Sequence, residues 1–94
     1  EAIPFLSGAK ELASEGHIPG GTRKNLAWIS PQLLPGSHSE ITQLLLADAQ
    51  TSGGLIFGLN PSKTSTALKH LAQSDHSAAV IGTTTSGSGT IKLE

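Results

Sequence analysis

The spacing of apolar residues predicts a first helix over residues 4–15. Pro4 suits the first turn of a helix, where its missing N–H is not needed. Gly16 suits the position just after the last turn, where the backbone commonly becomes left-handed. One face of this helix would collect the apolar side chains, which recur at helical spacing: Phe5, Ala9, Leu12 and Ala13.

Two further helices are predicted, over residues 38–47 and 61–73. Ser37 and Glu40 have the spacing of a capping box, in which side chains satisfy free backbone N–H groups at a helix start. Asn60 followed by Pro61 is typical of a helix cap and the first helical residue. Each helix has an apolar stripe, formed by Ile41, Leu44 and Leu45 in one and by Ala67, Leu68, Leu71 and Ala72 in the other.

Short apolar runs predict strands over residues 26–29, 54–59, 78–84 and 90–93. Residues 86–89, which alternate Ser and Gly, are typical of a flexible turn, so we expect the last two strands to form a hairpin. Helices and strands in this order favour an α+β fold, with helices layered on a mixed sheet. We detect no internal repeat and no domain boundary, which indicates a single domain or part of one.

Composition narrows the classes of function. The chain has 94 residues and a formal net charge of -1, which argues against nucleic-acid binding by broad phosphate neutralisation. It has no cysteine, and therefore no disulfide, thiolate nucleophile or cysteine-ligated zinc. We see no signal peptide and no apolar run near the ~20 residues that a membrane span needs. We therefore predict a cytoplasmic location without membrane association.

The chain has no methionine and begins at Glu1, so we expect it to be a piece of a longer protein. Leu93 and Glu94 are either native or a remnant of cloning, and the sequence leaves both open.

A glycine-rich stretch, residues 20–25, lies within a predicted loop over residues 17–25. Its paired glycines would let backbone N–H groups approach a ligand closely. Its Thr and Asn add hydrogen-bonding groups, and its two basic residues add positive charge. An ordinary glycine-rich turn with two solvated bases is the alternative. The candidates to hold a phosphate or a carboxylate are Gly20, Gly21, Thr22, Arg23 and Asn25.

A second polar stretch, residues 48–54, joins a predicted helix to a predicted strand. Its carboxylate, Asp48, is suited to binding a metal, accepting a hydrogen bond or capping the loop. One carboxylate is too few for an all-protein metal site or for a general acid–base pair. A simple helix-to-strand connection is the alternative. The candidates to contact a substrate here are Asp48, Gln50, Thr51, Ser52, Gly53 and Gly54.

Other candidate motifs carry no chemistry. Residues 58–64 differ from a P-loop because the spacing is one residue short and Ser62 replaces the second glycine. No two of the four histidines have the i, i+4 spacing of a helical metal site. The many serines make any Ser/His/Asp pairing uninformative.

The order of these motifs resembles the last quarter of selenophosphate synthetase, also called selenide, water dikinase. The run Asp-Ala-Gln-Thr-Ser-Gly-Gly-Leu at residues 48–55 is similar to the family's Asp-Pro-Gln-Thr-Ser-Gly-Gly-Leu signature. It follows the glycine-rich stretch and precedes a helix and the Ala-Val-Ile-Gly run of residues 79–82. Ala49 replaces the usual Pro, which leaves the loop less rigid. Lys24 replaces a common Arg, which loses bidentate geometry.

The resemblance implies a reaction and a fold. The family uses ATP, selenide, water and magnesium to make selenophosphate, AMP and phosphate. Its catalytic Cys or selenocysteine, its Lys and its metal-binding aspartates precede the matched region. The implied fold is a three-layer α/β/α sandwich, partly ferredoxin-like, as in the C-terminal domain of aminoimidazole ribonucleotide synthetase. We expect ATP and magnesium in the parent enzyme but none on this chain alone, which we expect to be inactive.

Three functions follow as hypotheses. In the first, the chain is a C-terminal piece of a selenophosphate synthetase-like enzyme, and residues 19–25 and 48–54 shape a phosphate-handling cleft against the missing N-terminal domain. In the second, it is a non-catalytic assembly module whose uncovered sheet edges or apolar face either form a homodimer or bind the missing part of the protein. In the third, it is a small anion-binding domain. We assign no catalytic residue and no metal ligand within the chain.

Overall fold

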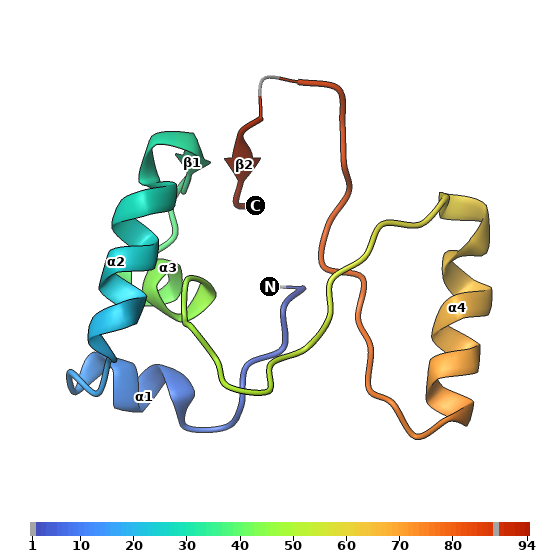
Figure 1. Ribbon diagram of the computed structural model, residues 1–94, viewed down its shortest axis with the longest axis horizontal. Helices are drawn as coiled ribbons and strands as arrows, with labels where there is room; N and C mark the ends of the chain where they lie inside the picture. Colours follow the sequence, from blue (N-terminus) through green and yellow to red (C-terminus); the bar gives the residue numbers. More distant parts are fainter. Residues whose placement is uncertain (1, 88) are drawn as a thin grey trace. The chain divides into compact units, whose positions relative to one another are not determined.

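The computed structural model describes residues 2–87 and 89–94 (Figure 1). These residues form two compact units, one from the described parts of Phe5–Gly53 and Ser86–Glu94, the other from residues 2–4 and Gly54–Thr85. In chain order the elements are α1 (Ala9–Ser14), α2 (Gly20–Ile29), a 3-10 turn (Ser30–Gln32), β1 (Leu33–Leu34), α3 (Glu40–Leu46), α4 (Pro61–Gln73) and β2 (Ile91–Lys92).

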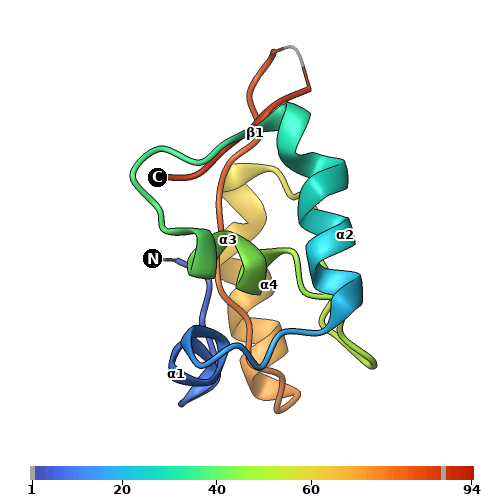
Figure 2. The same ribbon diagram turned by 90° about the vertical axis from the view of Figure 1, so that its left-hand side faces the viewer.

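In the first unit α3 contacts both α1 and α2 (Figure 2). Its core is small: among the described residues, Ala13 of α1, Thr22 of α2 and Leu44 of α3 are buried. Each of the three helices therefore contributes one fully covered side chain, and the one from α2 is polar.

Helix α1 begins later than the sequence predicts. Gly8 precedes it with φ of +83°, a left-handed conformation through which a right-handed helix cannot extend back to Pro4. Its end is as predicted. Gly16 has φ of +94°, its N–H donates to Ala13 O at 3.1 Å, and the N–H of His17 donates to Leu12 O at 3.0 Å. These two bonds form a Schellman cap, which satisfies carbonyls of the last turn.

The predicted loop over residues 17–25 is confirmed for residues 17–19 and wrong for the rest, and the predicted strand over 26–29 is wrong. Residues Gly20–Ile29 form one helix, α2, which starts after an extended Pro19. Glycine is a poor helix former, but Leu26 and Ile29, three residues apart, are half-buried on one side of this helix. Packing against α3 thus overrides the local preference of the two glycines.

Helix α3 confirms the prediction over residues 38–47, with a different cap. The helix begins at Glu40, and Ser39 rather than Ser37 is its N-cap, because the Ser39 hydroxyl accepts from the Thr42 N–H at 3.3 Å. Gly36 has φ of +58° and lies in the turn before the helix, and Ser37 directly follows it in that turn. A serine caps this helix as predicted, but it lies two residues further along the chain.

Strand β2 pairs in parallel with β1, so the predicted hairpin with residues 78–84 is wrong. Leu33 lies opposite Ile91, and Leu34 lies opposite Lys92. The Leu93 N–H extends the ladder by donating to Leu34 O at 3.0 Å. The sequence analysis missed β1, which is two residues long and lies between Pro31 and Pro35.

In the second unit α4 confirms the predicted helix over 61–73. The Asn60 carboxamide oxygen accepts from the Ser62 N–H at 3.0 Å and from its hydroxyl at 2.8 Å, and Pro61 is the first helical residue. The helix ends in a second Schellman cap, in which Asp75 adopts φ of +59° and the N–H of His76 donates to Leu71 O at 2.9 Å.

The predicted strands over 54–59 and 78–84 are not strands in the structure. Their backbone has no ladder partner among the described residues, and a strand without a partner leaves its N–H and C=O groups unpaired. Leu55 and Ile56 are 91% and 84% exposed. The broad prediction of mixed helix and sheet is confirmed, whereas the layered sandwich is not formed. Within the described part of the chain, no helix is long and apolar enough to cross a membrane.

Replacing Asp75 by Gly should stabilise α4. A non-glycine residue with left-handed φ costs roughly 1 kcal/mol, and the carboxylate also meets the negative end of the helix dipole. We expect amide hydrogen exchange in α4 to slow by about fivefold, the factor that corresponds to about 1 kcal/mol. Asp75→Ala removes the charge but keeps the unfavourable φ, so it should gain less. Equal protection in the two variants would contradict the backbone explanation.

Replacing Gly36 by Ala should loosen the pairing of β1 with β2. Its φ of +58° disfavours a side chain, and a Cβ would lie 3.3 Å from Leu93 O. We expect a loss of about 1–2 kcal/mol, seen as faster hydrogen exchange of the Leu93 N–H. Gly20→Ala is the control, because a Cβ there meets no atom within 4 Å. Unchanged exchange at Leu93 in Gly36→Ala would refute this prediction.

Candidate functional site

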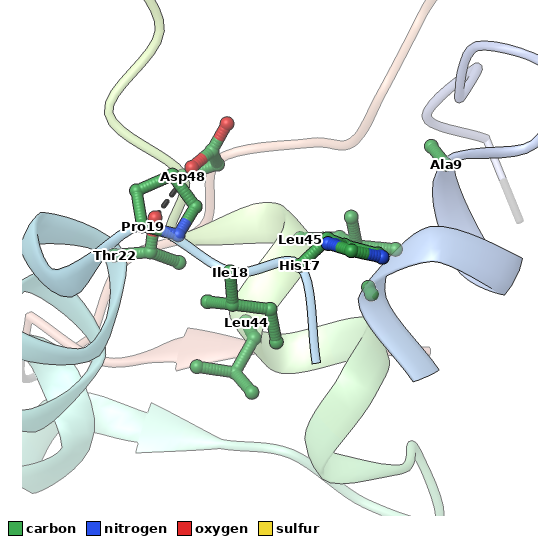
Figure 3. A pocket seen from close by; sticks show the side chains of 9 residues that line it. Ala9, His17, Ile18, Pro19, Thr22, Leu44, Leu45 and Asp48 are labelled. Atoms are coloured by element: carbon green, nitrogen blue, oxygen red, sulfur yellow. Dashed lines mark hydrogen bonds between the residues drawn. The ribbon is translucent and has the colours of Figure 1, made fainter. Parts of the chain in front are cut away.

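The two polar stretches that the sequence analysis singled out meet where α2 contacts the end of α3. Thr22, the third residue of α2, donates its hydroxyl hydrogen to Asp48 Oδ1 (Figure 3). Asp48 is half-buried and lies two residues beyond the last residue of α3. Thr22 is 2% exposed, so this hydroxyl has lost its contact with water and is satisfied by the carboxylate.

A second hydrogen bond lies one helical turn further along α2. The Asn25 Nδ2 donates to the carbonyl oxygen of Ala47 at 3.0 Å. Ala47 is the C-cap of α3, and carbonyls at a helix end have no intrahelical partner. Asn25 therefore satisfies a carbonyl that the helix itself cannot. The sequence analysis missed Ala47, although its place directly before Asp48 was a usable signal.

A small cavity of about 60 Å³ lies beside the hydrogen bond from Thr22 to Asp48 (Figure 3). It is far too small for a nucleotide. Its lining is apolar apart from His17, Thr22 and Asp48, and comprises Ala9, Ala13, His17, Ile18, Pro19, Thr22, Leu44, Leu45 and Asp48.

The remaining residues of the glycine-rich stretch are exposed. Gly20 and Gly21 are the first two residues of α2, where backbone N–H groups have no intrahelical acceptor. Arg23 is exposed and forms no ion pair with a described residue. The structure thus brings Thr22 and Asn25 to the second stretch and leaves Arg23 apart from it.

Residues 50–53 form an exposed turn that begins two residues after Asp48. Ser52 has φ of +57°. Gly53 lies close to Gln50, because a Cβ on this glycine would sit 3.4 Å from that of Gln50. The polar side chains of Gln50, Thr51 and Ser52 are therefore accessible. Gly54 belongs to the other compact unit.

The described residues contain no group of three or more His, Cys, Asp or Glu side chains arranged to hold a metal ion. Shifts of pKa occur at the end of the chain. A hydrogen bond from Lys92 to Glu94 at 2.8 Å raises the pKa of Lys92 and lowers the pKa of Glu94. Both side chains are exposed, and neither takes part in the candidate site.

Comparison with curated proteins shows similarity to selenide, water dikinases. The chain is 40% identical over 93 residues to the enzyme of Carboxydothermus hydrogenoformans. The matched region covers 98% of the chain and 27% of the relative. It is 39% identical over 88 residues to that of Myxococcus xanthus, covering 93% of the chain and 25% of the relative. It is 42% identical over 79 residues to an enzyme of Campylobacter jejuni, covering 84% of the chain and 22% of the relative.

The resemblance drawn from the two motifs is therefore confirmed, and the chain spans about a quarter of the length of the curated relatives it matches. No family model matches the sequence, and no solved structure gives a significant match.

Replacing Asn25 by Asp should weaken the attachment of α2 to α3. The two side chains have the same shape and similar helix propensities, but a carboxylate cannot donate to the carbonyl of Ala47 and would repel it. We expect urea unfolding to show a loss of about 1 kcal/mol or more. Lys24→Gln, at an exposed neighbouring position of the same helix, should change stability by less than about 0.5 kcal/mol. Equal stability of the two variants would show that the contact contributes nothing.

Proposed function

We propose that this chain, a relative of the C-terminal part of selenide, water dikinases over nearly its full length, supplies the loop of residues 48–53 to the active site of such an enzyme. The parent enzyme would convert ATP, selenide and water to selenophosphate, AMP and phosphate. In this proposal the chain shapes the site, and the remaining three quarters of the protein perform the chemistry.

The observation that carries the proposal is the anchored and accessible loop. Asp48 at its start is held by Thr22, whereas Gln50, Thr51 and Ser52 expose their polar side chains. A loop held at its base and open at its tip is suited to presenting hydroxyl, amide and backbone N–H groups to an anionic substrate.

The residues of this chain do not fit a magnesium site of their own. The candidate loop offers one carboxylate, Asp48, and the described residues bring no group of three potential ligands together, whereas Mg²⁺ held by so few carboxylates depends on phosphates of the substrate. The chain also has no cysteine. We therefore assign the metal, the nucleotide and the nucleophile to the N-terminal part of the parent enzyme, which is the partner we propose.

An assembly role is the second candidate, and one observation favours it. Leu55 and Ile56 are almost fully exposed on an extended segment that has no ladder partner among the described residues. Such a segment is prone to pair with another strand. Light scattering decides whether the isolated chain pairs with itself: a monomer at high concentration counts against a homodimer.

The proposed function is tested by exchanging segments. The matching quarter of the Carboxydothermus hydrogenoformans enzyme is replaced by this chain, and AMP formation from ATP and selenide is measured. We expect the chimera to be active, and both the chain alone and the relative truncated before this segment to be inactive.

Two results would contradict the proposal. A folded, monodisperse chimera with no more activity than the truncated enzyme would show that the chain cannot supply the site. AMP release by the chain alone would show that the chemistry does not need the rest of the protein.

A further inference from the structure

We propose that Thr22 is a positioning residue for the loop of residues 48–53, acting through Asp48, and that Asp48 works there as a hydrogen-bond acceptor rather than as a metal ligand or proton carrier. The activity measurements that test this inference rest on the proposed function, whereas the proteolysis measurement does not.

The burial of Thr22 is the first argument. It is 2% exposed and is the polar member of the buried set that the structure describes. A buried hydroxyl without a partner is costly, so α2 can hold Thr22 here only while an acceptor is supplied. Asp48 Oδ1 is that acceptor. The position of the carboxylate is therefore coupled to the packing of α2 on α3.

The second argument is that two neighbouring residues are held from one helix. Thr22 and Asn25 are three residues apart and so lie on the same side of α2. They bind Asp48 and Ala47, which are consecutive. Two bonds to consecutive residues fix both the position and the direction of the chain as it leaves α3. The exposed turn that contains Ser52 starts from this fixed base.

The third argument concerns charge. The Asp48 carboxylate is bonded to the third residue of α2, in the first turn of a ten-residue helix. The partial positive charge of a helix N-terminus stabilises a nearby carboxylate, and so does the hydroxyl bond. The carboxylate of Asp48 thus has a hydroxyl donor and a helix N-terminus as partners within this chain.

Activity of the chimera separates the roles that Asp48 can have. Thr22→Val removes the donor, and Asp48→Ala removes the acceptor. We expect each to lower kcat/KM by up to about 100-fold, mainly through kcat, because misplacing a site by about 1 Å has effects of this size. Thr22→Ser and Asp48→Asn keep the donor and the acceptor and should retain activity within about threefold. They also change the fold least, so they remain informative if a harsher variant fails to fold.

Ser30→Ala is the matched control. Ser30 is on the end of the same helix, and its hydroxyl donates to Leu26 O at 2.7 Å. Its loss removes an exposed hydroxyl bond within the same helix without touching residues 47–53, so activity should not change. If Asp48→Asn loses as much activity as Asp48→Ala, Asp48 acts through its charge and the inference is wrong. If Thr22→Val keeps full activity in an active chimera, the inference fails while the proposed function stands.

Limited proteolysis of the 94-residue chain gives the readout that needs no activity. Cleavage within residues 49–53 by a protease of broad specificity should speed up about tenfold in Thr22→Val and in Asp48→Ala, and no further in the double variant. Since the two side chains act through one bond, their effects should not add. A double variant cut about 100-fold faster would overturn the coupling. An inactive parent chimera combined with non-additive cleavage would refute the proposed function and support the coupling.

Discussion

The hydrogen bond from Thr22 to Asp48 is the constraint on which the candidate site depends. It joins residues 26 positions apart and ties the first turn of α2 to the chain just beyond α3. It requires three conditions: α2 must start near Gly20, Thr22 must face α3, and α3 must end before Ala47. The extended Pro19 precedes the start of α2, and the half-buried Leu26 and Ile29 orient that helix. The bond from Asn25, which spans 22 residues, holds the carbonyl of Ala47 where α3 ends.

The helical conformation of residues 20–29 explains why the sequence analysis did not find that Thr22 and Asn25 act together. Thr22 and Asn25 were selected for their chemistry, in a stretch expected to be a loop. In a loop, their separation would say nothing about whether they share a partner. In a helix, a separation of three residues places them on one side, and both reach the end of α3. The two motifs singled out these residues, whereas their joint attachment to the end of α3 follows only from the helix.

Elements with local determinants were the predictable ones. Helix α4 matches its prediction because Asn60 and Pro61 define its start through neighbours in sequence. The strands were predicted less well because a strand depends on a partner that can lie anywhere in the chain. Residues 91–92 illustrate this point: a strand forms within the predicted range 90–93, but it pairs with residues 33–34 rather than with the preceding run.

The polarity of the chain changes sharply at the end of the candidate loop, and this change bears on how the loop is held. Residues 50–53 expose polar groups, whereas Leu55 and Ile56 expose apolar ones on backbone without a ladder partner in the described residues. Thr22 and Asn25 fix the entry to the loop, but an unpaired extended run is a weak support for its exit. In a parent enzyme of the proposed kind, a strand from the rest of the protein that paired with this run would fix the exit. The loop would then reach its working geometry on assembly, with its entry already set by the bond to Asp48.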